Sequence, residues 1–208
     1  MIGAMVSPYE RYVLPWLFEH ACGIGPIQQK RSGLIPRAQG RVLEIGIGTG
    51  HNMAFYDAGR VTEVIAVDPA EQMHDRARER AAAAGIDVRV LGLSAESIPL
   101  EDGEVDTVVT TFTLCSIPDP AAALAEMRRV LRPGGELLFC EHGLAPTDKV
   151  RKWQRRLNPV QRRIAGGCHL DRDVATLVRG SFEITTLDEG FVPGGPKVAT
   201  YLYTGTAG

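Results

Sequence analysis

Glycines at alternate positions, Gly46, Gly48 and Gly50, follow a short apolar run at residues 41–45. Glycine adopts positive φ angles and has no side chain, so such a turn lets a ligand approach the backbone closely. The spacing differs from the G-x-G-x-x-G turn of dinucleotide-binding proteins, and no lysine follows as a phosphate-binding loop requires. We therefore predict a ligand-binding turn between a strand and a helix. A tight turn that binds nothing is the alternative.

A carboxylate, Asp68, follows the next β-branched run. In parallel sheets ligands bind at the carboxyl ends of the strands, and an acidic residue after the second strand accepts hydrogen bonds from ribose hydroxyls. Backbone amides at the start of the next helix favour electron-rich ligand groups. The glycine turn and Asp68 together predict a nucleoside-containing cofactor.

Side chains that could serve a second reactant come later in the chain. His142 follows an apolar run that ends at Glu141, where it could act as a base; a histidine hydrogen-bonded for structure is the alternative. Cys115 and Cys168 are either small buried hydrophobes or substrate contacts. His169, beside Cys168, has too few metal ligands near it in the sequence, so we expect no metal site.

Strand-like and helix-like segments alternate through most of the chain, which predicts an α/β fold with a parallel sheet and helices on both faces. Strands are expected near residues 41–46, 63–67, 87–93, 105–111 and 136–141. Helices are expected near residues 52–57, 70–84, 120–132 and 171–179, with Asp119 as the N-cap of the third. Two last strands, near 182–187 and 197–203, flank a Pro/Gly turn and predict an antiparallel hairpin at one edge.

The composition fits a single globular domain over residues 1–208: 44% of the residues are hydrophobic, 23% are charged and the net charge is −2. This balance carries no nucleic-acid signature, so we expect no nucleic-acid partner. No apolar run approaches the length that spans a bilayer, and Glu10, Arg11, Glu19 and His20 interrupt any signal-like stretch. Four scattered cysteines suit reduced thiols. These features predict a cytoplasmic protein.

Residues 144–170 break the alternation and are predicted to form a basic amphipathic insertion. Between residues 149 and 163 there are seven basic residues and no acidic one. An apolar stripe at helical spacing is formed by Val150, Trp153, Leu157, Val160 and Ile164. Asn158–Pro159 is expected to separate two helices. The stripe either packs on the sheet or closes a lid over the acceptor, and the basic face of that lid would meet an anionic substrate or a membrane surface peripherally.

Four sequence blocks occur in one order between about residues 40 and 141: E-I-G-I-G-T-G, V-D-P, S-A-E-S-I-P-L-E-D-G-E-V-D and L-R-P-G-G-E-L. This series resembles the class I S-adenosylmethionine-dependent methyltransferases. The resemblance implies S-adenosylmethionine as the cofactor. It also implies a Rossmann-like, seven-stranded, mostly parallel sheet whose last strand is antiparallel.

The resemblance assigns roles to single residues as well. The portion of the cofactor derived from methionine would lie over Glu44 and over the loop of Gly46, Ile47, Gly48, Thr49 and Gly50. Asp68 would hold the ribose. Adenine contacts would come from Pro69, Met73, Ser94, Ala95 and Glu96, and the methionine end would lie near Thr111 and Phe112. Family members often have an aspartate where this chain has Ser94, and a hydroxyl accepts a hydrogen bond from the adenine amino group more weakly than a carboxylate.

Shorter blocks concern the methyl acceptor: T-L-C-S-I at 113–117, E-H at 141–142, W-Q-x-x-L-x-P at 153–159 and G-C-x-L-x-R at 167–172. They are similar to blocks of the alkyl-thiol methyltransferases and, more distantly, of phosphatidylethanolamine N-methyltransferases and quinone-biosynthesis C-methyltransferases. A small thiol is therefore the expected acceptor, and a lipid amine or a quinone is the alternative. A cofactor-binding scaffold without catalysis is a second, different class of function.

Contacts with the acceptor are expected from Tyr9, Cys115, Trp153 and His169, with His142 as the candidate base. Residues 1–38 are expected to form an N-terminal helical cap, of which residues 9–18 would be one wall of the acceptor site. The basic insertion would be the other wall.

Overall fold

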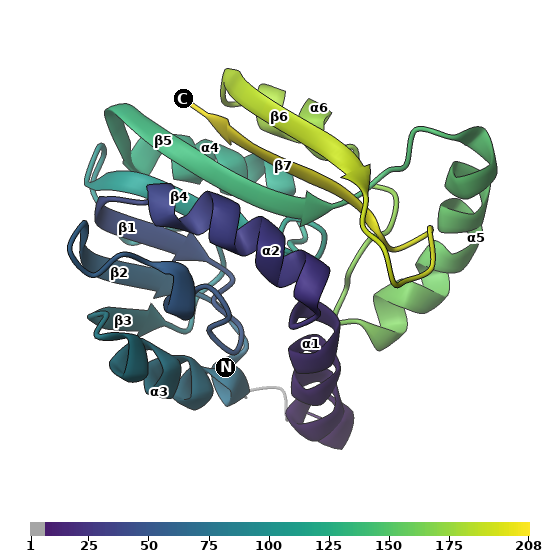
Figure 1. The fold of residues 1–208 in the computed structure, drawn as a ribbon, viewed down its shortest axis with the longest axis horizontal. Helices are drawn as coiled ribbons and strands as arrows, with labels where there is room; N and C mark the ends of the chain where they lie inside the picture. Colours follow the sequence, from purple (N-terminus) through teal and green to yellow (C-terminus); the bar gives the residue numbers. More distant parts are fainter. Residues whose placement is uncertain (1–6) are drawn as a thin grey trace.

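Within residues 7–208, the part of the chain that the computed structural model describes, seven strands form one mixed sheet. The strand order is β3-β2-β1-β4-β5-β7-β6 (Figure 1). The strands are β1 (Gly40–Ile45), β2 (Val61–Val67), β3 (Val88–Leu91), β4 (Val105–Thr111), β5 (Leu131–His142), β6 (Ile184–Phe191) and β7 (Tyr201–Ala207). Strands β1 to β5 pair in parallel, whereas β7 runs antiparallel between β5 and β6. The expected fold class is confirmed.

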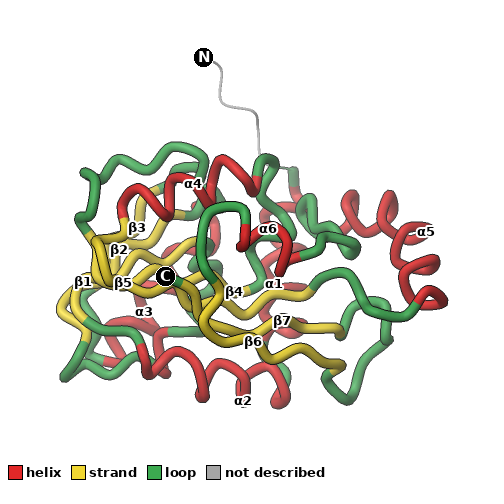
Figure 2. The backbone as a smooth tube through the Cα atoms, turned by 90° about the horizontal axis from the view of Figure 1, so that it is seen from above, coloured by secondary structure: helices red, strands yellow, loops and turns green. Residues whose placement is uncertain are grey.

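Helices cover both faces of this sheet, as Figure 2 shows from above. The helices are η1 (Tyr9–Val13), α1 (Leu14–Cys22), α2 (Gly25–Leu34), α3 (His74–Ala84), α4 (Pro120–Val130), α5 (Asp148–Ile164) and α6 (Val174–Arg179), besides short 3₁₀ turns. Successive strand residues point to opposite faces, so Val42 lies in the core under α2 and α3, and Leu43 in the core under α4 and α6. No helix among the described residues is both long and apolar enough to cross a bilayer. Residues 1–6 of the expected cap lie outside the described residues.

Local sequence signals set one end of each of two helices, and one of them is the predicted cap at Asp119. Asp119 caps α4, because its side chain accepts a hydrogen bond from the Ala122 N–H at 3.0 Å, and Pro120 occupies the first turn. Gly85 ends α3 with a φ of 69°, the left-handed conformation that glycine adopts most easily. These local patterns therefore set both helix boundaries.

The helix predicted at residues 52–57 is wrong, since the structure has only a 3₁₀ turn there, η3 (Met53–Phe55). The side chains that flank this turn point inward to β1. Asn52 donates to one Glu44 carboxylate oxygen at 3.0 Å, and Tyr56 donates to the other at 2.7 Å. To make this contact Tyr56 has an extended backbone, with a ψ of 140°, and this ends the turn.

The last two strands form the expected antiparallel hairpin, but both are shifted along the chain. Strand β6 continues to Phe191 and β7 begins only at Tyr201, because the turn between them is long. The Val192 N–H donates to the Thr200 carbonyl at 2.9 Å and closes this turn. Strand β7 can then pair with β5 over most of its length.

The break predicted at Asn158–Pro159 is also wrong, because α5 is one helix with Pro159 inside it. Proline removes one backbone N–H from a helix and usually kinks or ends it. Polar side chains hold α5 against the rest of the domain around this position. Gln154, fully buried, accepts from the Ala145 N–H at 3.0 Å and donates to two backbone carbonyls, and Asn158 accepts from the Leu170 N–H at 2.9 Å.

Most of the apolar stripe of α5 is exposed to solvent, and only its first residue, Val150, packs against the hydrophobic core. Trp153 is 48% exposed and Val160 is 57% exposed, and the helix stands beyond the edge of the sheet (Figure 1). The interpretation in which this stripe packs on the sheet is therefore wrong for the four residues from Trp153 to Ile164. The fully buried residue of α5 is the polar Gln154.

Candidate cofactor and acceptor site

The glycine loop, residues 46–50, follows β1 at the point where the strand order reverses. Gly46, Gly48 and Gly50 have positive φ angles of 75°, 52° and 82°. A methyl group at Gly50 would lie 2.8 Å from the Cα atom of Ala77, so this glycine lets α3 approach the loop. A methyl group at Gly48 would meet no atom within 4 Å. The loop therefore has open space at its middle glycine, which fits a cofactor that lies against the backbone.

Asp68 follows β2 and is buried beside this loop. One carboxylate oxygen accepts from the Gly48 N–H at 2.7 Å, and the other accepts from the Ala70 N–H at 2.8 Å. Asp68 thus lies at the carboxyl edge of the sheet, tied to the middle of the glycine loop. Each oxygen keeps a second lone pair, so both can still accept hydrogen bonds from ribose hydroxyls.

The residues predicted to contact the adenine differ in exposure. Met73 and Ala95 are buried, whereas Pro69 and Ser94 are exposed. Ser94 Oγ donates to the carboxylate of Glu96, which also accepts from a backbone N–H before α4 at 3.2 Å. The hydroxyl of Ser94 is therefore engaged within its own loop, where a family aspartate would offer a free carboxylate.

A buried polar network lies beneath the glycine loop. Glu44 accepts from Asn52 and Tyr56, as described above, and Asn52 also donates to Thr111 Oγ1 at 3.1 Å. Burial raises the pKa of Glu44 to about 7, although the bonds from Tyr56 and Asn52 oppose the shift. Sequence reasoning identified Glu44 and Thr111 but missed Asn52 and Tyr56, whose partners only the fold brings near.

Arg31 of α2 completes this network from the N-terminal part of the chain. Its Nη1 atom donates to Asn52 Oδ1 at 2.5 Å and to Thr111 Oγ1 at 2.8 Å. Its guanidinium lies over the Phe112 ring, 5.4 Å from the centroid. Phe112 has a φ of 56°, which is uncommon for a residue with a bulky side chain. Arg31 therefore helps to hold the end of β4, and no motif in the sequence pointed to it.

Helix α1 reaches the glycine loop through Glu19. Thr49 Oγ1 donates to one Glu19 oxygen at 2.7 Å, and Arg80 Nη2 of α3 donates to the other at 2.6 Å. Burial by itself would raise the pKa of Glu19, but the bonds from Arg80 and Thr49 outweigh it and lower the pKa to about 2. A cleft of about 760 Å³ opens here between α1, α3 and the loop, with Thr49 and Met73 in its lining.

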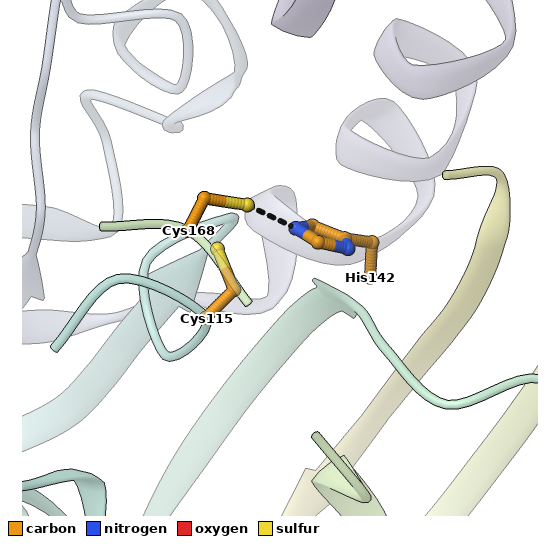
Figure 3. Close-up of side chains that lie close together, drawn as sticks. All are labelled: Cys115, His142 and Cys168. Carbon is orange, nitrogen blue, oxygen red and sulfur yellow. Dashed lines mark hydrogen bonds between the residues drawn. The ribbon is translucent and has the colours of Figure 1, made fainter. Parts of the chain in front are cut away.

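Cys115, His142 and Cys168 come together beside Phe112, and we name them the sulfur–imidazole cluster (Figure 3). One side-chain S or N atom of each lies within 4.8 Å of the other two, and all three residues are buried. His142 Nε2 is 3.1 Å from Cys168 Sγ, and the rings of His142 and Phe112 have centroids 6.4 Å apart. Burial opposes protonation of His142, but the contact with Cys168 outweighs it and raises the pKa of the imidazole.

Glu141 holds the turn that carries Cys115. Its buried carboxylate accepts from Thr110 Oγ1 at 2.8 Å and from the Thr113 N–H at 2.9 Å. These bonds join the end of β5 to the turn after β4, while the next residue, His142, faces the cysteines. In the sequence Glu141 stood out only as the neighbour of His142, because its partners lie on another strand.

The other residues predicted to contact the acceptor lie apart from one another. Tyr9 donates to the Ile164 carbonyl at 2.5 Å, which joins η1 to the end of α5. His169 follows the cluster in the chain and is partly buried. Trp153 lies on the exposed side of α5. The structure therefore gathers the predicted contact Cys115, together with Cys168, around His142 and leaves Trp153 facing solvent.

Comparisons with known proteins agree with this geometry. Residues 43–139 match the model of a family described as a methyltransferase domain. The chain is 37% identical over 145 residues to the thiol S-methyltransferase TMT1B of Rattus norvegicus, and the match covers 64% of this chain and 55% of that protein. It is 38% identical over 105 residues to a phosphatidylethanolamine N-methyltransferase of Cereibacter sphaeroides, covering 50% of this chain and 51% of that protein. The chain thus spans about half the length of these relatives.

The same architecture occurs in solved structures. A SAM-dependent methyltransferase from Thermotoga maritima has a TM-score of 0.66 to this chain at 20% identity, and the alignment covers 96% of each chain. At this identity the likeness shows the fold. Fold, glycine loop and sequence relatives together lead to one conclusion: this chain carries a class I S-adenosylmethionine-dependent methyltransferase domain.

Proposed function

We propose that this domain transfers the methyl group of S-adenosylmethionine to a small thiol. The thiol S-methyltransferases among its relatives support this acceptor, and the sulfur–imidazole cluster is the observation that carries it. The cluster is buried and rich in sulfur, beside the residues expected at the methionine end of the cofactor. A neutral thiol enters such surroundings at a lower cost than an ammonium group, because burying an unpaired charge is unfavourable.

The cofactor would lie across the glycine loop in this proposal. The open space at Gly48 would take the methionine portion, Asp68 would accept from the ribose hydroxyls, and Met73 and Ala95 would flank the adenine. When bound, S-adenosylmethionine supplies an electrophilic methyl group. The residues of this chain then orient the acceptor in line with that methyl group and keep water away from it.

Methylation of a thiol requires little from the protein beyond this positioning, because no strong base is needed. With an unperturbed pKa of about 8.5, a thiol already offers a few per cent of thiolate at neutral pH. A lipid amine must first lose a proton, and a phenolic ring carbon needs an oxyanion before it can react. The buried cluster, which holds no carboxylate of its own, suits the least demanding of these acceptors.

The test is a panel of acceptors incubated with methyl-labelled S-adenosylmethionine. We expect small alkyl thiols to be methylated in solution, and primary amines and phenols to react far more slowly. Labelling of thiols no faster than the reaction without protein would refute the thiol assignment. Product formation from phosphatidylethanolamine vesicles, with thiols inert, would favour the second candidate.

The second candidate is methylation of a lipid amine by a protein bound peripherally to a membrane. The exposed stripe of α5 favours it, since Trp153, Val160 and their neighbours face solvent beside seven basic residues. Such a helix suits the interface of an anionic bilayer, where apolar side chains enter and cations meet the headgroups. The similarity to a phosphatidylethanolamine N-methyltransferase also supports this candidate.

Vesicle flotation tests the membrane part of this candidate. Binding to anionic vesicles that contain phosphatidylethanolamine should weaken with added salt, because salt screens surface charges, and should fall in Trp153→Glu. Leu93→Glu is the matched control, since Leu93 is 42% exposed but lies outside α5. Equal binding of both variants and the wild type would show that α5 does not contact the membrane.

A further inference from the structure

We propose that the sulfur–imidazole cluster binds a soft divalent cation, for which Zn²⁺ is the best match, and leaves one coordination position for the acceptor thiolate. The cation site stands on the geometry of the cluster, whereas its open position rests on the proposed function. Two cysteines and one histidine with a free fourth position form a ligand set typical of catalytic zinc sites. Here the three residues come from three segments: the turn after β4, the end of β5 and the loop after α5.

The spacing of the three donor atoms fits one tetrahedral cation. With Zn–S bonds of about 2.3 Å and Zn–N bonds of about 2.0–2.1 Å, the donor atoms of a tetrahedral site lie roughly 3.6–3.8 Å apart. In this structure His142 Nε2 lies 3.1 Å from Cys168 Sγ, and all three donors lie within 4.8 Å of one another. Figure 3 shows both sulfur atoms and the imidazole turned toward one another. Small rotations of the cysteine side chains would therefore complete the site.

The contact with Cys115 and burial raise the pKa of the Cys168 thiol in the absence of a cation, but two neighbouring polar groups could support a thiolate bound to one. Gln161 Nε2 donates to Cys168 Sγ at 3.7 Å, as residues that support a metal ligand commonly do. The Arg172 guanidinium donates to the carbonyl of Leu114, the residue before Cys115. Two cysteine thiolates would balance the charge of the cation. Arg172 would then offset the additional charge of an acceptor thiolate.

A thiol acceptor must lose its proton to become a good nucleophile. A cation bound here would promote that loss. The acceptor would coordinate through sulfur and release its proton to solvent. A sulfur lone pair would then form the new S–CH₃ bond, while the bond between that methyl group and the sulfonium breaks and its electron pair stays on S-adenosylhomocysteine. In this proposal His142 is a ligand of the cation, whereas the sequence suggested that it acts as a base.

The test begins with metal-free protein, kept reduced and titrated with Co²⁺ as a spectroscopic probe. We expect a thiolate-to-cobalt charge-transfer band that saturates at about one equivalent and disappears when Zn²⁺ is added. Cys115→Ser, Cys168→Ser and His142→Gln should each weaken Co²⁺ binding by at least about tenfold, since even the supporting residues of metal sites have effects of this size. Cys22→Ser and His20→Gln, which lie outside the cluster, are the matched controls.

The outcomes separate the two parts of the proposal. No band in the wild type, or equal losses in the control variants, would overturn the cation site. If one cluster variant fails to fold, as circular dichroism would reveal, the other two still decide. A thiol that the protein methylates, added without methyl donor, should shift the band; an unchanged band would overturn the open position.

Activity is measured separately, so that failure of the proposed function is recognisable. Thiol methylation that is undiminished in the metal-free protein would overturn the activating role of the cation and leave the thiol assignment standing. Thiols that stay unmethylated with and without Zn²⁺ would refute the proposed function, while the Co²⁺ titration still decides the cation site.

Discussion

Asp68 is the residue on which cofactor binding should depend most. Its two oxygens are fixed by the Gly48 and Ala70 N–H groups and would each accept a charge-assisted bond from a ribose hydroxyl. Such bonds contribute about 1.5–3 kcal/mol each, so Asp68→Ala should weaken S-adenosylmethionine binding by at least about tenfold, which needs only about 1.4 kcal/mol. Isothermal calorimetry measures this, with the exposed Asp75→Ala as control. Equal affinities would contradict the ribose assignment.

Glu44 should make stability depend on pH. Burial raises its pKa to about 7, against 4.5 for the unpaired group, so the folded state binds this proton more tightly than the unfolded state. The stabilisation is complete below pH 4.5 and is lost as the pH rises through 7. We expect the unfolding free energy of the wild type, relative to Glu44→Gln, to fall by on the order of 3 kcal/mol over this range.

Urea unfolding at several pH values checks the expectation for Glu44. The exposed Glu79→Gln is the control, and its difference from the wild type should stay constant with pH. A constant difference for Glu44→Gln as well would show that this carboxyl has no raised pKa in the folded protein.

At the scale of the elements, the attachment of α5 to the rest of the domain depends more on one buried amide side chain than on the apolar stripe of the helix. Gln154 satisfies the Ala145 N–H and the carbonyls of Gly143 and Val198. Gln154→Ala would leave these backbone groups without partners, and each buried unpaired group costs about 1–3 kcal/mol. We expect a loss of at least about 2 kcal/mol in unfolding free energy, against almost none for the exposed neighbour Arg155→Ala. A loss below about 0.5 kcal/mol, the size usual for surface changes, would contradict this account.

The whole molecule should unfold as one unit, because the hydrophobic cores on the two faces both pack against the same sheet. The two tryptophans test this well: Trp16 lies in α1 and Trp153 in α5, both outside the sheet. Their fluorescence and the far-ultraviolet circular dichroism should give the same urea midpoint, as a two-state transition requires. An earlier fluorescence transition would mean that the N-terminal cap or α5 unfolds separately from the sheet, and this would contradict a single domain.

The sequence by itself determined the features that depend on neighbours in the chain. The run Val105–Thr111 forms a strand because of its β-branched residues, and Asp119 starts α4 because a carboxylate three residues away can reach Ala122 N–H. The glycine loop and Asp68 were found in the same way. These patterns act over a few residues, so they can be read before the fold is known.

Only the tertiary structure decided which distant residues meet. Strand β5 pairs with β4, and this brings His142 near Cys115; the return of the chain from α5 adds Cys168. Arg31 reaches Thr111 because α2 crosses the same strand ends. Helix α5 continues through Pro159 because contacts such as those of Gln154 hold it. Each of these outcomes depends on which elements are neighbours in space, and periodicity along the chain carries no information about that.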